Sequence, residues 1–248
     1  MIPFVVGAML LQTVQAKPQP IALATPFGVG ETLEYGGKWS GYPFGEVAKA
    51  TMKIAAIDTV RGVPQWHFSM TTRISALVFH NHTELESWTT VGDFNSHRYT
   101  HKVNEQGKQL ADDDFQIFGD SGYYRNRNDT LKKRTPPNPL DDVSFIYYLR
   151  TMAFKKDSTY KIPRYFRDDH NPVEVTVIGH DTLEMPDGSR RSCWVIHPVV
   201  DEPNGMFARK ANARIWLSDD GVRIPVQIVS DLVIGHVTLK LKSITHSQ

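Results

Sequence analysis

Apolar and polar residues alternate along much of the chain, and this alternation predicts β-strands. Near the end of the sequence, Val237, Leu239 and Leu241 alternate with polar or charged residues, as expected of a strand with one buried face. The segment 30–57 alternates twice about a Gly/Pro turn and predicts a β-hairpin. The segment 63–74 continues the series, with Trp66, Phe68 and Met70 sharing one face.

Further strands are predicted over the segments 93–128, 158–166, 172–200 and 212–244. Turns are expected at 105–108 and 186–188, and the carboxylates of Asp112 to Asp114 are expected in an exposed turn. The segment 76–90 is ambiguous between a strand and a short helix. Pro225 has no backbone N–H to donate to a neighbouring strand, so its strand is expected to lie at an edge or to carry a bulge.

One segment, about 141–153, has the periodicity of a helix. A proline-rich stretch precedes it, Asp141 can serve as its N-cap, and the charge of Asp142 suits the positive end of the helix dipole. Its apolar residues recur at three- and four-residue spacing: Phe145, Ile146, Leu149, Met152 and Ala153. We therefore expect one principal helix, packed in or against the sheet.

These elements predict a mainly β, β-rich α+β fold: a strongly curved antiparallel sheet or half-open barrel with one helix. The sequence contains no internal repeat and no long linker, so residues 27–246 are expected to form one domain, after a flexible leader at 17–26. A helix about 10 to 12 Å across is too narrow to cover the whole apolar face of such a sheet. The remaining face is expected to close on itself or to line a cavity.

The first residues have the features of a signal peptide, predicted as 1–16. An apolar run from Ile2 to Leu11 is followed by small residues that suit cleavage after Ala16, although no Lys or Arg precedes the run. The alternative is a buried first strand or helix. A membrane-spanning helix needs about 20 apolar residues, so no transmembrane anchor is expected in the mature chain. The predicted location is the periplasm.

Charge and cysteine content exclude several kinds of partner and cross-link. The chain has 28 Lys and Arg against 27 Asp and Glu, so it has no strong net field and a nucleic-acid partner is not expected. Its one cysteine, Cys193, excludes an internal disulfide and is predicted to be a small packed side chain.

The sequence predicts no catalytic residues, no cofactor and no metal. It lacks the G-x-S-x-G elbow and the Gly-rich phosphate loop. His80, His82 and Glu84 would share a face if their segment is a strand, but zinc normally takes three or four well-placed ligands. Asp219 and Asp220 precede Gly221, a pattern typical of a turn. We therefore expect a non-catalytic protein.

Several apolar residues are candidates for lining a ligand cavity or the helix face towards it. Trp216 shares a strand face with Arg214, opposite Ile215, and either covers neighbouring strands or forms a binding platform. The candidate ligand-binding set consists of residues with large apolar side chains: Trp39, Phe145, Ile146, Leu149, Trp216 and Leu239.

Three blocks, 27–54, 141–154 and 213–244, resemble the recurring blocks of a bacterial family, domain of unknown function 3108. The resemblance implies an exported envelope protein with no established activity. Residues here that match the family's blocks are Trp216, already named as a candidate ligand-binding residue, and eight that are expected to be structural: Glu31, Tyr35, Asp141, Ser144, Arg150, Asp220, Pro225 and Gly235. Glu31 and Arg150 are expected to form an ion pair. The final strands are also similar to those of the LolA and LolB lipoprotein carriers, whose half-open barrel holds acyl chains.

Three functions remain open from the sequence. The first is a soluble envelope protein that binds an apolar ligand, a lipid or a lipoprotein acyl chain, in a half-barrel cavity. The second is an envelope protein with a filled core that binds a protein partner through its surface. The third is a hydrolase acting on envelope polymers, for which the only indication is the abundance of His and Asp.

Overall fold

A computed structural model describes residues 25–42, 44–203, 205–232 and 235–246. The predicted signal peptide, 1–16, lies outside the described residues, as does the predicted leader up to residue 24. The strands are β1 (Thr32–Trp39), β2 (Ala48–Val60), β3 (Val63–Ala76), β4 (Phe79–Thr90), β5 (Ser96–Glu105), β6 (Lys108–Phe118), β7 (Tyr123–Asn126), β8 (Lys133–Arg134), β9 (Thr159–Ile162), β10 (Val173–Glu184), β11 (Arg190–Val199), β12 (Arg214–Ser218), β13 (Pro225–Leu232) and β14 (Gly235–Thr245), and the helix α1 is Asp142–Leu149.

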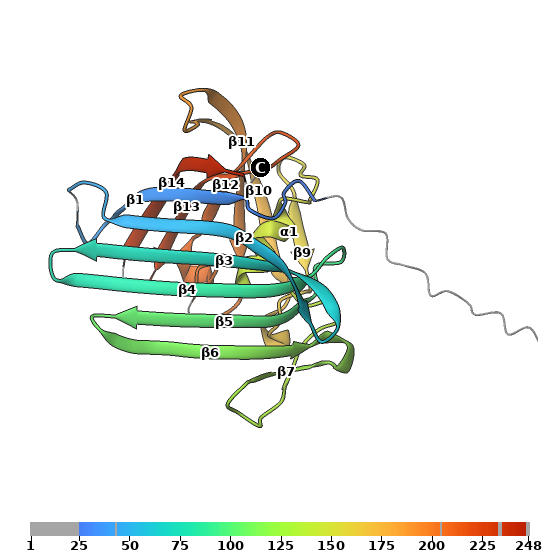
Figure 1. Cartoon of the computed structure of the whole chain (residues 1–248). Coiled ribbons are helices and arrows are strands. Elements are labelled where there is room, and N and C mark those ends of the chain that lie inside the picture. Colours follow the sequence, from blue (N-terminus) through green and yellow to red (C-terminus); the bar gives the residue numbers. More distant parts are fainter. Residues whose placement is uncertain (1–24, 43, 204, 233–234, 247–248) are drawn as a thin grey trace, which may run out of the picture.

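All fourteen strands belong to one antiparallel sheet in the order β8-β7-β6-β5-β4-β3-β2-β1-β14-β13-β12-β11-β10-β9. Strands β1 to β8 form one meander and β9 to β14 form another, and the pairing of β1 with β14 joins the two. The sheet curves so that β1 to β6 form one wall and the later strands cross behind it, with α1 at one end (Figure 1). The predicted curved, β-rich fold with one principal helix is confirmed.

The inner face of this sheet carries the apolar residues that the alternation predicted. Trp66, Phe68 and Met70 of β3 are buried, while His67 and Ser69 between them are partly exposed. On β14, Val237, Leu239 and Leu241 are buried opposite exposed lysines. Burying one face of each strand removes apolar area from water at about 25 cal/mol per Å², which gives the sheet its main stabilisation.

Two regions that the sequence left open or misplaced are strands. The ambiguous segment 76–90 contains β4, which pairs with both β3 and β5. The expected turn at Asp112 to Asp114 is wrong, because these residues lie inside β6. The hairpin already turns at Gln106 and Gly107, both with positive φ, so the carboxylates that follow continue the ladder. Asp114 accepts hydrogen bonds from the guanidinium of Arg98 at 2.8 and 2.9 Å.

The helix is shorter than the predicted 141–153. Its start agrees, with Asp141 as N-cap, but α1 ends at Leu149 with Arg150 as C-cap. The amide groups of Arg150, Thr151 and Met152 bond to carbonyls three residues back, which tightens and ends the last turn. The sequence did not indicate this end, because apolar residues continue at helical spacing to Met152 and Ala153 and no Gly or Pro follows Leu149 directly.

The proline at the start of β13 lies at a bulge, as its sequence position predicted. Trp216 pairs with Gln227 and Leu217 pairs with Pro225, so β13 holds one extra residue at this point. A bulge tolerates the missing donor of proline and increases the local bend of the strand.

Gly37 is expected to be intolerant of a side chain, because a Cβ there would lie 2.1 Å from the backbone oxygen of Thr238. We predict that Gly37→Ala lowers the free energy of unfolding by about 1 to 3 kcal/mol, the usual cost of overpacking. The neighbouring Gly36→Ala is the matched control, because the atoms nearest to its Cβ belong to the flexible side chains of Glu46 and Lys242 and not to the backbone. Urea denaturation of both variants would measure the difference, and equal losses would contradict the steric argument.

Candidate functional site

A fully buried ion pair fixes the C-terminal end of α1. The guanidinium of Arg150 donates to Glu31 Oε1 at 2.5 Å and to Oε2 at 2.9 Å, and both side chains are essentially inaccessible to solvent. Arg150 also donates to the carbonyl of Val222 and lies over the ring of Phe27 at 4.9 Å. The ion pair predicted from the sequence is confirmed, and it ties the start of β1 to α1 and to the β12–β13 turn.

Other residues of the family blocks gather at the same turn. Tyr35 Oη donates to the carbonyl of Pro225 at 2.8 Å. Asp220 Oδ1 accepts from Ser218 Oγ and from the amides of Val222 and Arg223. Asp220 therefore shapes the turn, as predicted, and these residues have a structural role.

The other end of α1 carries a buried carboxylate. Asp141 Oδ1 accepts from the amides of Val143 and Ser144, and Oδ2 accepts from Ser87 Oγ at 2.6 Å. Ser144 Oγ accepts from the amide of Asp141 in return, which completes a capping box. Burial raises the pKa of Asp141 from 3.8 to about 6, although the hydrogen bonds from Ser87, Ser144 and Ser96 act in the opposite direction.

A second carboxylate, Asp142, belongs to a polar chain that runs from α1 towards the surface. It accepts from Tyr99 Oη at 2.9 Å and from Tyr165 Oη at 3.1 Å. Tyr165 Oη also lies 2.9 Å from Glu202 Oε1, whose carboxyl pairs with Arg167 at 2.7 Å. Burial and the proximity of Asp142 raise the pKa of Glu202. The hydroxyl of Tyr165 therefore lies within hydrogen-bonding distance of both carboxyl groups.

Arg167 lies at the edge of a polar cleft of about 450 Å³, which we call the Arg167 cleft. Its lining is mostly charged or polar, and is formed by Asp113, Phe115, Tyr124, Arg125, Asn126, Asp129, Leu131, Lys133, Arg167, Asp169 and His170. Several of these groups already have partners within the protein, such as Glu202 for Arg167 and Gln116 for Arg125. This lining is unsuited to an apolar ligand.

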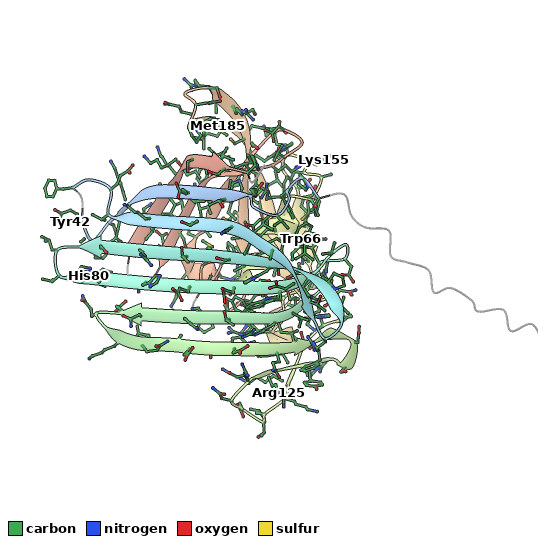
Figure 2. All side chains as sticks on the ribbon, viewed as in Figure 1. Tyr42, Trp66, His80, Arg125, Lys155 and Met185 are labelled. Carbon is green, nitrogen blue, oxygen red and sulfur yellow. The ribbon has the colours of Figure 1, made fainter. Side chains whose placement is uncertain are left out.

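A second cleft, of about 340 Å³, lies between the β10–β11 hairpin and strands β13 and β14. We call it the Met185 cleft, and its lining residues are Leu183, Glu184, Met185, Pro186, Val226, Gln227, Lys240, Leu241 and Lys242. Figure 2 shows Met185 on the hairpin that projects beyond the curved sheet. Val226 and Leu241 are buried residues of the core, so the lining of this cleft combines apolar core residues with charged and polar ones.

The predicted ligand-binding residues do not share one cavity. Phe145, Ile146, Leu149 and Leu239 are buried in the core, and the ring of Phe145 lies 5.7 Å from that of Phe207. Trp39 is partly buried and stacks on Phe79 at 4.6 Å. Trp216 lies on the other face of β12 from Ile215, and its indole donates to Asp181 at 3.2 Å.

The lining of the Met185 cleft was missed by the sequence reading. Leu183 and Met185 both precede the predicted turn at 186–188, and their spacing of two is the available signal for a shared face. That signal does not reveal which distant strands the face meets. Gly235, the last family-block residue, has φ of 116° and begins β14 beside Trp39.

The histidines that the sequence placed on one strand face lie along β4. His80, His82 and Glu84 alternate along β4, and His82 Nε2 lies 3.4 Å from Glu84 Oε1. Within the described residues, no three His, Cys, Asp or Glu side chains are grouped so as to hold a metal ion. None of the helices in that same part of the chain has the length and apolar character needed to cross a bilayer.

Comparison of structures shows what fold this chain shares. A β-barrel-like protein of domain of unknown function DUF1849 from Brucella abortus matches 89% of this chain and 98% of its own, with a TM-score of 0.57 and 10% identity. A hypothetical protein from Chlamydia trachomatis covers 88% of each chain at 10% identity, with a TM-score of 0.30. At these identities the first likeness shows a β-barrel-like fold and no function.

Sequence comparison assigns the family. None of the curated proteins compared with the chain matches it. The model of the family described as "Protein of unknown function (DUF3108)" matches residues 32–242, which include most of the sheet, the helix and the buried Arg150. The chain therefore belongs to the DUF3108 family, as its three sequence blocks indicated.

Proposed function

We propose that this protein is a non-catalytic binding protein of the cell envelope that holds the acyl chain of a lipid or lipoprotein in the Met185 cleft. The observation that carries the proposal is the composition of this cleft, in which Val226 and Leu241 of the apolar core are joined by Leu183 and Met185 of the hairpin. Export to the periplasm follows from the predicted signal peptide at 1–16 and is part of the proposal.

The rest of the half-barrel explains why the cleft, and not the helix face, is the proposed site. Beside α1 the interior is filled by the protein's own aromatic rings. The ring of Phe68 stacks on Tyr147 at 4.0 Å, and Phe27 packs edge-on against both Phe68 and Tyr147. An acyl chain therefore fits better at the Met185 cleft, away from the helix residues predicted to bind it.

Size and charge support an amphiphilic ligand. The volume of about 340 Å³ falls in the usual range of ligand pockets, roughly 300 to 1,000 Å³. Each buried CH₂ of an acyl chain contributes about 0.8 kcal/mol to binding. Lys240 and Lys242 also line the cleft, and Lys242 pairs with Glu46 at 2.5 Å. The lysines suit the anionic group of a fatty acid or phospholipid, and binding of this kind requires no reacting side chain.

Filling the cleft should abolish lipid binding. We predict that Leu183→Trp, which places a bulky ring in the cleft wall, lowers acyl-chain occupancy at least tenfold. The matched control is Ile178→Trp, because Ile178 lies on the same strand with an exposed side chain outside the cleft. Native mass spectrometry and lipid extraction of protein purified from an envelope fraction would measure occupancy, and thermal melts would confirm folding of both variants.

Two results would count against the proposal in different ways. If the wild-type protein carries no lipid and takes up no added palmitate, acyl-chain binding is wrong. If lipid binds equally well to the wild type and to Leu183→Trp, the protein binds lipid elsewhere and the assignment to the Met185 cleft is wrong.

A further inference from the structure

We propose that the tips of the β1–β2, β3–β4 and β5–β6 hairpins insert into the surface of an anionic lipid bilayer. This proposal rests on observations separate from the Met185 cleft and does not depend on the proposed function. Four large apolar side chains, which we call the hairpin rim, carry it: Phe44, Leu77, Val78 and Leu110. Their exposed fractions are 74%, 80%, 84% and 60%.

The hairpin rim lies at one edge of the molecule. Tyr42 of the β1–β2 connection and His80 next to the β3–β4 turn lie on the same side in Figure 2, at the edge away from α1 in Figure 1. The β5–β6 turn lies at this edge too, since β4 and β5 pair antiparallel with Asn81 opposite Glu105. The three hairpins, and with them the hairpin rim, therefore lie at the same edge of the molecule.

The β3–β4 turn departs from the turn chemistry used elsewhere in this chain. The β2–β3 turn is Arg61-Gly62 and the β5–β6 turn is Gln106-Gly107, with positive φ at all four residues, the usual choice for a two-residue hairpin loop. The β3–β4 turn is Leu77-Val78, and Leu77 adopts a φ of 48°. A leucine at positive φ is strained, and its exposed side chain gains no burial in return. This combination indicates a contact outside the folded chain.

Exposed cations lie behind the tips. Lys38, Arg73, Lys102 and Lys108 are exposed, and no ion pair or hydrogen bond joins their side chains to another residue in the described part of the chain. Two of these cations face carboxylates across the sheet: Lys102 lies opposite Glu84 and Asp112, and Lys108 lies opposite Glu105. Arg73 instead lies opposite Lys49 and His82, and Lys38 lies opposite Thr238, so positive charge without a facing carboxylate gathers on β1 to β3.

The spacing between the apolar tips and the cations matches the depth profile of a bilayer surface. Arg73 precedes Leu77 by four residues, which is about 13 Å along a strand at roughly 3.3 Å per residue. An inserted apolar side chain reaches about 5 to 10 Å into the boundary of headgroups and acyl chains. The basic side chains would then lie at the level of the headgroups, where their long stems can bend towards anionic groups.

A lipid surface suits the hairpin rim better than a protein partner does. A stable protein interface needs about 1,000 Å² or more of closely fitting surface, whereas the rim consists of separate tips on different hairpins. A fluid bilayer accommodates separate insertion points without a complementary shape. The excess of positive charge selects anionic lipid over neutral lipid.

Vesicle cosedimentation tests this proposal directly. The wild-type protein is expected to bind vesicles of phosphatidylcholine with phosphatidylglycerol, and to bind pure phosphatidylcholine vesicles at least tenfold more weakly. The binding should be lost at about 1 M salt, where the Debye length is only about 3 Å.

Two kinds of variant separate the apolar and the electrostatic contributions. The double variant Leu77→Gly with Val78→Ser removes the apolar tip and relieves the positive φ, so it should fold at least as well as the wild type and bind roughly tenfold more weakly. Arg73→Gln and Lys38→Gln should each weaken binding to anionic vesicles about fivefold. Leu131→Ser and Lys155→Gln are matched controls, because both residues are exposed away from the hairpin rim.

The proposal is overturned if the wild type binds neither kind of vesicle. It is also overturned if Leu77→Gly with Val78→Ser binds as tightly as the wild type, or if Leu131→Ser weakens binding to the same extent. Retention of acyl-chain binding in the double variant would show that the hairpin rim and the Met185 cleft act separately.

Discussion

Replacing Arg150 with methionine is expected to lower the free energy of unfolding by about 3 to 5 kcal/mol. The substitution leaves Glu31 fully buried without the guanidinium that now donates to both of its oxygens. A buried carboxyl without its partner either retains an uncompensated charge or takes up a proton, and both alternatives cost free energy. For a chain of this size, a loss of this magnitude corresponds to a decrease in melting temperature of roughly 10 °C.

The double variant Glu31→Leu with Arg150→Met distinguishes two causes of the lost stability. One is the loss of the ion pair itself, and the other is the burial of Glu31 without a partner. It removes both charged groups, so it should recover at least half of the stability that Arg150→Met loses. Urea denaturation of the wild type, the single variant and the double variant would measure this. Equal stability of the two variants would show that packing and the bonds to Val222, not the isolation of Glu31, cause the loss.

The second large effect is a dependence of stability on pH that originates at Asp141. Burial raises its pKa in the folded protein to about 6, above the ordinary 3.8, so the folded state binds a proton more tightly than the unfolded state. Stability from this group is therefore fully present below about pH 4, falls as the pH rises towards 6, and stays constant above that. At about 1.4 kcal/mol for each tenfold change in proton affinity, the loss is up to about 3 kcal/mol.

Asp141→Asn should remove this part of the pH dependence. An asparagine oxygen caps α1 as well as aspartate does, and its amide can donate to Ser87, whose hydroxyl then donates to Thr89 at 2.8 Å. The variant should match or exceed the wild type at pH 7, with a flatter profile between pH 4 and 6. The pKa of Glu202 is also raised by burial and by Asp142, so the difference between the two proteins is the informative quantity. An unchanged profile would contradict the assignment to Asp141.

The sequence predicted the strands of this fold well because each strand has one buried and one solvated face. In β3 and β14, apolar and polar residues alternate with a period of two. The capping residue Asp141 marks the start of α1. The end of α1 was missed because apolar spacing continues to Met152 while the backbone tightens at Arg150. The spacing of apolar residues indicates which face of a helix is buried, but it does not indicate the residue at which the helix ends.

The candidate site was less predictable, for a different physical reason. Alternation placed Trp216 opposite Ile215 correctly, but it gave no indication that Trp216 would bond to Asp181 of β10 outside the core. The Met185 cleft combines the β10–β11 hairpin with residues of β13 and β14. The contact between this hairpin and these two strands depends on the curvature of the whole sheet, which a short stretch of sequence does not predict. The Glu31–Arg150 pair was predictable because the family blocks single out both residues.

The pairing of β1 with β14 has a consequence for how the chain reaches this structure. Thr32 lies opposite Thr245. The pairing of β1 with β14 therefore brings together the first and the last strand of the sheet, which are separated by nearly the whole described chain. Each meander is built from neighbouring strands and can form early, whereas contacts of such large sequence separation form late and slowly. Until β14 is available, the exposed ladder of β1 is an unpaired strand edge, the kind of surface on which chains associate. Association of chains through β1 is therefore the reaction that competes with folding until the last strand pairs.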